Sequence, residues 1–538
     1  MRDRLEKIAL QRLPNWQQNS PRLSKLALWD MYLDATIYDC LRNEFDEDSI
    51  PGRSTPRYIQ MKERKPSVKS GLAGTTASNL ARKLFAGRHA PSLVLKDGAE
   101  SNDAIQKLQD LLTEAQVGSQ MIWLVRRGSV GSVCATYKIV EIEGEEPQLV
   151  MDVHHAVDCF PVFDAAKQLS RLRIAYATAG QWFIDNEVTT DLKGEPVKPT
   201  ELYWYIRDLD KISETHYVPV PTAAWNPIEG FPESAEIKNL RPIEEGPLAV
   251  VQHELGYTPA QWFVNMTDGR FPDGGCIFEP GLDNIVVYDY GMSQLDLGVK
   301  NAACPITVLK GNLVQQLDGD NKPIPRSPTR YLQFEPTTKD GDMVEEGGSA
   351  EYLETTGQGF KMGLEFYRQI KKDATEQISA SRKDPDKVTT AMSGKGLELV
   401  EEENIDLAFD FRTSFGAAYL KMIIKMGRAA IKKNHPLMDG VTEDEVKQVK
   451  LAWPDMHDLS PQEFQAFAQG LVAEQEAGVI SPAQAQELHR TKVDVPISHL
   501  EGPKVASTPE TIMEAELALA KASKPAPPVK PKAKPKAK

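Results

Sequence analysis

Three N-terminal stretches are predicted to be helices. The first has apolar residues at mixed spacing, the second is small and polar with Leu80 and Leu84 four apart, and the third has the regular apolar stripe of a helix with one buried face. They lie at about 22–45, 67–85 and 102–127. Ser24 is expected to cap the first helix and Asn102 the third, because short polar side chains accept hydrogen bonds from the free N–H groups of a first turn. The N-terminal part is therefore expected to be helical.

From Gly131 to about Asn265 the pattern changes to alternating apolar and polar positions with many β-branched and aromatic side chains. This pattern predicts strands. The predicted strands are VCATYKIVEI, RLRIAYAT, ELYWYIRDL and THYVPVP. Between them, FPVFDAAKQ and NPIEGFPE are rich in turn residues and are expected to be loops. A mainly β region thus follows the helical one.

Further helices are predicted at about 281–302, 349–381 and 393–433. At 1.5 Å per residue, the second would span roughly 50 Å. Between the first two of these helices, the segments PITVLKG and RYLQFEP are predicted to be short strands. The polar break RKDPDKVTT, which contains Pro385, precedes the third helix. Towards the C-terminus, KQVKLAW predicts a strand, followed by short helices at about 461–475 and from Ser481.

The composition of the 538 residues is that of a globular protein, with 41% hydrophobic and 26% charged residues, so the chain can bury a core. Its five cysteines lie far apart without the spacing of a disulfide framework or a zinc site. No apolar run is long enough for a membrane span, and the N-terminus lacks the apolar region of a signal peptide. Synthesis and assembly in a cytoplasm are expected.

The net charge of −14 is unevenly distributed, because the last 18 residues carry seven lysines and no acid. An acidic body argues against a conventional DNA-binding protein, which needs a basic face to displace counterions. It does not argue against a wall past which DNA slides, since like charge discourages adhesion. The basic tail could contact DNA or scaffold by charge attraction, or serve only for solubility.

Two possible chemical motifs are weak. SGKG at 393–396 resembles part of a phosphate-binding loop, but Thr389 and Gly396 replace its required glycine and hydroxyl residue, so a helix start is favoured. His154 and His155, with Asp158 and Cys159, could suggest a metal site. Neighbours on a strand point in opposite directions, so a structural histidine pair is favoured. No catalytic constellation stands out, and we expect no enzymatic activity, no metal and no cofactor.

Four segments carry a family resemblance. They are HELGYTPAQWFVN at 253–265, YDYGMSQLDLGVKNAACPITVLKG at 288–311 with Ser293, ISASRKDPDKVTTAMSGKGLELV at 378–400, and AGVISPAQAQELH at 477–489. In local sequence and in order they resemble segments of the portal (head-to-tail connector) proteins of tailed bacteriophages, and the resemblance extends over roughly residues 20–500. Ala485 departs from the family pattern, which often has a hydroxyl residue there.

The resemblance implies an α+β portal fold with a helical and β wing, a two-helix stem, a small α/β clip, a long wing helix with a channel loop, and a helical crown. Transferred to this sequence, the plan is wing 1–280, first stem helix 281–302, clip 303–348, second stem helix 349–381, channel loop 382–392, long wing helix with return strand 393–455, crown 456–502 and a flexible Lys/Pro-rich tail 503–538.

The function that the resemblance implies is that of one subunit of a homo-oligomeric ring, of about twelve subunits in the family, at the unique capsid vertex of the virion. Double-stranded DNA would pass through the ring during packaging, retention and ejection. The implied partners are the terminase motor, the major capsid or scaffold protein, and tail adaptor proteins, with no membrane.

The resemblance also implies three groups of site residues, and each has a plainer alternative. The channel loop would offer weak contacts to DNA phosphates, or be a solvated charged loop: Arg382, Lys383, Asp384, Asp386 and Lys387. The second stem helix would present basic residues to the lumen or to neighbouring subunits, or simply to solvent: Arg368, Lys371 and Lys372. The clip would dock terminase and adaptors, or be a hairpin with polar loops: Lys310, Lys322, Arg326 and Arg330.

Two other classes of function compete with this hypothesis. Another structural virion protein, such as a head–tail adaptor or a minor head protein, would lack the succession of long helix, polar loop and long helix around Pro385. A nucleic-acid-processing ATPase would need a nucleotide-binding motif, which the sequence does not offer.

Overall fold

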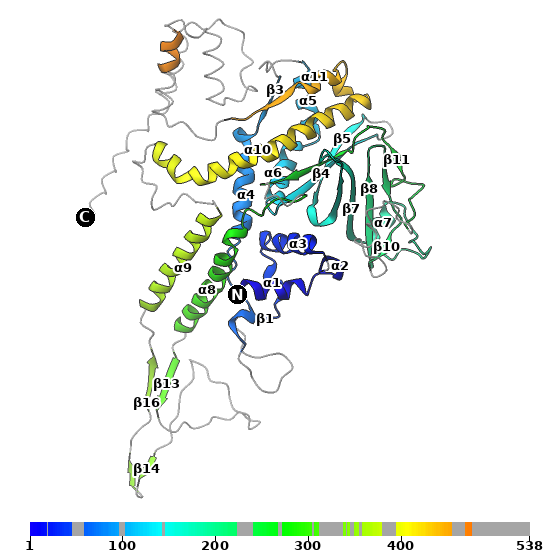
Figure 1. The fold of residues 1–538 in the computed structure, drawn as a ribbon. Helices are drawn as coiled ribbons and strands as arrows, with labels where there is room; N and C mark the ends of the chain where they lie inside the picture. Colours follow the sequence, from blue (N-terminus) through cyan, green and yellow to red (C-terminus); the bar gives the residue numbers. More distant parts are fainter. Residues whose placement is uncertain are drawn as a thin grey trace, which may run out of the picture. The chain divides into compact units, whose positions relative to one another are not determined.

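A computed structural model shows a protein of mixed helices and sheets, which confirms the α+β class (Figure 1). It describes residues 1–18, 20–45, 59–95, 103–141, 146–222, 240–266, 272–303, 306–310, 337–339, 342–344, 349–353, 358–378, 394–454 and 469–475. The chain forms two units, residues 1–467 and 468–538. Every element named below belongs to the first; of the second, the helical residues 469–475 are described.

The N-terminal region is helical, as predicted. Its α-helices are α1 (Arg2–Leu10), α2 (Asn15–Gln18), α3 (Pro21–Leu33), α4 (Leu72–Phe85), α5 (Asp103–Glu114) and α6 (Val117–Gly128), with short 3-10 turns at Ile37–Cys40, Met61–Glu63 and Gly87–His89. The helix α1 was not predicted, and α4 starts five residues later than expected, after Gly71 in a left-handed conformation. A single helix over 102–127 is wrong: the chain breaks at Gln116, with φ 51°.

The helix α3 ends well before the predicted residue 45. Ala35 takes a left-handed conformation with φ 54°, and the amide of Thr36 bonds back to the carbonyl of Met31 at 2.8 Å, which closes the last turn. The cap is also one turn earlier than expected. Ser20 accepts from the amide of Leu23 at 3.4 Å, whereas Ser24 lies inside the helix and donates to a backbone carbonyl.

Two antiparallel sheets form the β region. One has the order β12-β4-β5, from β4 (Ser132–Val140), β5 (Gln148–His155) and β12 (Ala260–Val264). The other has the order β11-β9-β8-β7-β6, from β6 (Cys159–Phe163), β7 (Leu169–Ala179), β8 (Leu202–Leu209), β9 (Ser213–His216) and β11 (Val251–Gln252), with β10 (Val220–Pro221) pairing with β8. The predicted loop at FPVF is wrong, because β6 pairs with β7 there. Helix α7 (Gly180–Asp185) follows β7.

The long helices come next. α8 (Leu282–Ala303) matches its prediction closely, and α10 (Gly394–Lys432) matches the predicted 393–433. Between them lie β13 (Ile306–Lys310), β14 (Thr337–Lys339), β15 (Asp342–Val344), β16 (Ser349–Leu353) and α9 (Gln358–Gln377), and after them α11 (Glu443–Lys447) and β17 (Val449–Ala452). The helix predicted from residue 349 is wrong at its start, because Ser349–Leu353 pairs antiparallel with β13.

One apolar core joins the N-terminal helices, the three-stranded sheet and α10. α10 packs its aromatic side chains inward: Phe411 and Phe415 are fully buried and stack with ring centroids 5.1 Å apart, and Phe415 also meets Phe263 of β12 at 5.5 Å. Gly128, the last residue of α6, lies against Phe415, where a Cβ would overlap the ring. The strand β17 pairs with β3 (Ser92–Leu95), which ties the chain beyond α10 to the N-terminal region.

Candidate functional site

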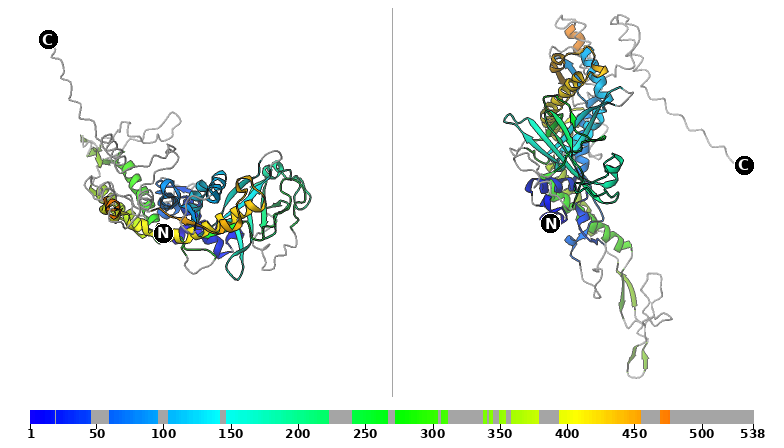
Figure 2. Two further views of the ribbon diagram at one scale, coloured as in Figure 1. Left: turned by 90° about the horizontal axis from the view of Figure 1, so that it is seen from above. Right: turned by 90° about the vertical axis from the view of Figure 1, so that its right-hand side faces the viewer.

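The helices α8 and α9 lie antiparallel and side by side (Figure 1), and the ladder of β13 with β16 continues beyond their adjoining ends (Figure 2, right). Two glycines of α8 meet aromatic side chains of α9, Gly298 with Phe360 and Gly291 with Tyr367, and Gly281, just before α8, meets Ile378, just after α9. A Cβ at any of the three would overlap its partner, so close packing of the two helices requires glycine there. We refer to α8, α9 and this ladder as the helical hairpin.

Polar contacts tether α8 to the segment that precedes α4. The buried carboxylate of Asp289 accepts from the hydroxyl of Tyr38 and from the amide of Ser70, both at 2.9 Å. One turn on, the hydroxyl of Ser293 accepts from the amide of Val68 at 2.9 Å. Burial raises the pKa of Asp289, and the hydrogen bonds from Ser70 and Tyr38 partly offset that rise. The hairpin is thus fixed at its base.

Sequence reasoning missed this tether. In the sequence, Ser293 stands out only as a feature of the family resemblance, and Asp289, within the segment 288–311, and Ser70, within the predicted helix 67–85, have no predicted role. For the packing of α8 on α9, by contrast, the sequence holds a signal: Gly291 and Gly298 lie seven residues apart, the repeat at which residues return to the same helix face. Their partners Tyr367 and Phe360 repeat at the same interval.

The predicted stem basic residues all lie on α9, in different surroundings. Arg368 and Lys372 are exposed, and Lys372 pairs within its own helix with Glu376 at 3.4 Å. Lys371 is half-buried, and its Nζ lies 5.8 Å from the centre of the Tyr288 ring on α8. Lys371 therefore takes part in the contact between the two helices, and Arg368 and Lys372 are available to other molecules.

The other predicted site residues cannot be compared with the structure. Lys310 ends β13 opposite Ser349, but only its backbone is described. The remaining clip residues and the whole channel loop lie outside the described residues: Lys322, Arg326, Arg330, Arg382, Lys383, Asp384, Asp386 and Lys387. Their roles stay predictions. Of the SGKG segment, Gly394 begins α10, in keeping with the predicted helix start.

Large apolar side chains are exposed on the hairpin. On α9, Met362 is 71% exposed and Phe366 60%; on α8, Val299 is 52% exposed. Met362 and Phe366 are one helical turn apart and offset from the residues that face α8. Side chains of this size exposed in neighbouring turns are typical of a surface that another protein covers. We refer to Met362 and Phe366 as the exposed apolar face.

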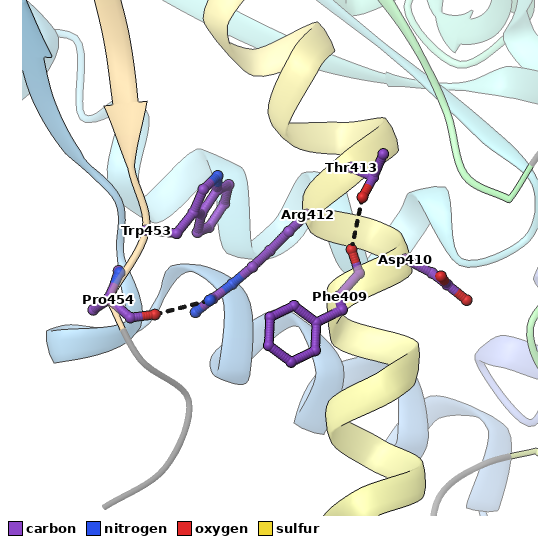
Figure 3. Close-up of a pocket in the computed structure, with 6 residues that line it drawn as sticks. All are labelled: Phe409, Asp410, Arg412, Thr413, Trp453 and Pro454. Carbon is purple, nitrogen blue, oxygen red and sulfur yellow. Dashed lines mark hydrogen bonds between the residues drawn. The ribbon is translucent and has the colours of Figure 1, made fainter.

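A small pocket of about 410 Å³ lies where α10 meets the strand β17 (Figure 3). Arg412 extends from α10 between two aromatic rings, 4.9 Å from the centre of Trp453 and 5.7 Å from that of Phe409. Its Nη1 donates to the carbonyl of Pro454 at 2.8 Å. These contacts hold the end of β17 against α10, so the structure explains Arg412 as a packing residue.

The histidine pair on β5 does not form a metal site. His154 bonds with the hydroxyl of Thr136 at 2.9 Å, and the Nδ1 of His155 lies 3.4 Å from Asp30. Burial, with the nearby charge of Arg207, lowers the pKa of His154 to about 3, so the ring is neutral. Within the described part of the chain, no group of His, Cys, Asp and Glu side chains could hold a metal ion. No described helix is long and apolar enough to cross a membrane.

Comparisons with known proteins give little support of their own. No protein-family model matches the chain, and no curated protein sequence is similar to it. Among solved structures, a chain in the neck of an empty GTA particle is similar at 10% identity and a TM-score of 0.35. A chain in the virion of a native gene transfer agent particle is similar at 12% identity and a TM-score of 0.33. Each match covers 78% of this chain and 89% of the other.

TM-scores this low do not establish a shared fold, so they are no basis for assigning a function. What the structure does define is a protein whose β region and N-terminal helices carry a projecting helical hairpin and a 39-residue helix that crosses the core.

Proposed function

We propose that this chain is the subunit of a portal ring, which forms the channel for viral DNA at the unique capsid vertex of a tailed bacteriophage. The observation that carries the proposal is the helical hairpin followed by α10. Two antiparallel helices, joined through a two-stranded ladder and followed by a helix of 39 residues, follow the order of the stem, clip and long wing helix in the family plan.

The packing of the hairpin suits a channel wall. Glycine-to-aromatic contacts fix the two helices in one register, and the tether at Asp289 holds their base. A wall past which DNA moves needs stiffness rather than affinity, and the acidic character of the chain favours sliding over adhesion. The exposed apolar face on Met362 and Phe366 supplies a surface that a neighbouring subunit would cover.

Within this proposal, terminase, scaffold and tail adaptors bind the assembled ring, and the clip region 303–348 is their docking surface. The loop 382–392 faces the channel, where Lys383 and Lys387 make weak contacts to phosphates beside Asp384 and Asp386. Packaging energy would come from the separate motor.

The test is electron microscopy of the purified full-length chain by negative staining. The proposal expects rings with a central hole wide enough for duplex DNA. Particles that stay monomeric over a range of salt and protein concentrations would contradict it. A head–tail adaptor or minor head protein, the competing assignment, could also form rings; nuclease protection of DNA threaded through the particle would separate a portal from these.

A further inference from the structure

A second cavity, of about 770 Å³, lies in the β region, well away in sequence from the helical hairpin. Strands of both sheets line it together with α6 and α7. This volume is within the range of pockets that hold small organic ligands or a few peptide residues. It plays no part in the proposed portal function, so its composition needs a separate explanation.

Aromatic rings form much of the wall. Tyr205 is buried, and its ring centroid lies 4.9 Å from that of Tyr176 and 5.0 Å from that of Trp182. Trp123 of α6 adds a further ring and stacks edge-to-face on His155 at 5.5 Å. Three of these rings, all except Tyr205, are only half-buried, so apolar ring surface remains open to the cavity. Such a wall favours a flat, apolar group.

A buried cation also lines the cavity. Arg207 is 4% exposed, and Oε1 of Glu214 lies 2.8 Å from its Nε. Among the described residues, neither Nε nor Nη2 of Arg207 has a hydrogen-bond acceptor in good geometry. The guanidinium carries five N–H donors, and a buried donor without an acceptor is costly. A carboxylate in the cavity would supply what Glu214, which is also bonded to His216, leaves unmet.

Arg173, a second buried arginine in the same sheet, is fully paired with a carboxylate and serves as a comparison. Its Nε and Nη2 each bond to a different oxygen of Asp208, both at 2.7 Å. This two-point geometry is the strongest form of arginine–carboxylate pairing. Arg207 has a close carboxylate oxygen, Oε1 of Glu214, but no such two-point pair, although the two arginines sit on adjacent strands, β7 and β8. The difference points to a ligand rather than to a requirement of the fold.

From this geometry we propose that the cavity is a binding site for a carboxylate carried on an aromatic or apolar body. The ring surfaces of Trp123, Tyr176 and Trp182 hold the body, and Arg207 receives the carboxylate. Asp152 and Asp158 also line the cavity, so a small, highly charged anion such as phosphate is disfavoured. A free organic acid and the C-terminal residue of a partner protein would present the same group.

The test uses the full-length protein and a matched pair of probes, N-acetyl-phenylalanine and its amide, which differ only in the charge of the carboxyl group. Binding is followed by quenching of tryptophan fluorescence, which Trp182→Phe should reduce. The acid is expected to bind about tenfold more tightly than the amide, because a hydrogen bond to a charged partner is lost in the amide. Equal binding of the two, no binding of either, or equally strong competition by inorganic phosphate would overturn the proposal.

Variants locate the site. Arg207→Gln should abolish the preference for the acid, whereas Arg173→Gln, which removes an equally buried arginine of the same sheet, should leave it intact. Because both changes break buried ion pairs and could prevent folding, Lys138→Gln serves as a milder variant. Lys138 lines the cavity from an exposed position, so its loss should weaken the acid alone, about twofold to threefold. If both single variants, Lys138→Gln and Arg207→Gln, kept the full preference for the acid over the amide, the binding site would lie elsewhere.

A longer probe identifies the source of the carboxylate. A pentapeptide that ends in phenylalanine adds backbone and side chains to the same terminal group. Tighter binding of the pentapeptide than of N-acetyl-phenylalanine assigns the cavity to a protein C-terminus, and equal or weaker binding assigns it to a free organic acid.

Discussion

At the scale of single residues, the close packing of the helical hairpin depends on glycines, which have no side chain. Gly291 and Gly298 leave room on α8 for the rings of Tyr367 and Phe360, which then occupy the space that a Cβ would need. Filling that space forces the rings or the helices to move, and protein interiors tolerate such overpacking poorly.

Gly291→Ala is therefore expected to lower the free energy of unfolding by about 1–3 kcal/mol, through the clash with Tyr367. Gly363→Ala is the matched control, because a Cβ there would meet only Leu295 at an ordinary contact distance of 3.6 Å. The control should gain up to about 1 kcal/mol, the usual benefit of alanine over glycine inside a helix. Urea unfolding of the three proteins measures both effects; a loss in both variants would argue against the specific clash.

A second residue-scale prediction concerns pH. Burial works against ionisation of Glu214, but its hydrogen bond with His216 and the charge of Arg207 outweigh burial and lower its pKa from near 4.5 to about 2. The folded state thus holds the proton less tightly than the unfolded chain. The resulting stability is fully present above pH 4.5 and is lost as the pH falls from 4.5 to 2, by on the order of 2–3 kcal/mol.

Glu214→Gln should remove this part of the acid sensitivity while lowering stability at neutral pH, because Arg207 then stays buried without a charged partner. The comparison is the slope of unfolding free energy against pH in each protein. Identical slopes below pH 4.5 would show that Glu214 titrates normally in the folded protein.

At the scale of elements, the sequence pattern located helices well where the helix was held by its own apolar stripe. α8 and α10 fall within one or two residues of the predicted ranges, since both carry long uninterrupted helical patterns. The patterns failed where distant residues decide the structure. Ser349–Leu353 forms β16 because β13 lies beside it, a contact that spans the whole clip and leaves no local sign in the sequence.

The buried charges were equally hard to foresee. Charged residues on a strand normally face solvent, but Arg173 and Arg207 are buried. Each is stabilised by a carboxylate from a neighbouring strand. Only the pairing of β7, β8 and β9 brings those carboxylates close. The cavity in the β region is therefore formed by tertiary contacts, and the sequence alone did not indicate it.

The start of α3 offers a direct test at this scale. Ser20→Ala should destabilise the protein by about 1 kcal/mol, because its hydroxyl accepts from the amide of Leu23 in the first turn. Ser24→Ala, at the position that the sequence pattern favoured, should have almost no effect, since that hydroxyl only donates to a carbonyl within the helix. Thermal unfolding distinguishes the two variants. Equal losses of stability would show that Ser20 does not cap α3.

At the scale of the whole molecule, assembly is the property that the exposed apolar face addresses. The double variant Met362→Ser and Phe366→Ser should weaken the association of subunits by at least tenfold, because two large side chains lose a buried contact. Ile212→Ser is the control: Ile212 is 61% exposed in the β region, outside the hairpin. Sedimentation velocity over a range of concentrations reports the oligomer, and equal behaviour of both variants would remove the hairpin from the subunit interface.

The paired glycines and aromatic rings have one more consequence, for mechanics. Sliding α9 along α8 would separate Tyr367 and Phe360 from Gly291 and Gly298, the two positions on α8 where the absence of a Cβ leaves room for a ring. The two helices are therefore expected to move as one unit, and a displacement of the ladder is expected to be felt at Asp289 and at its partners Tyr38 and Ser70.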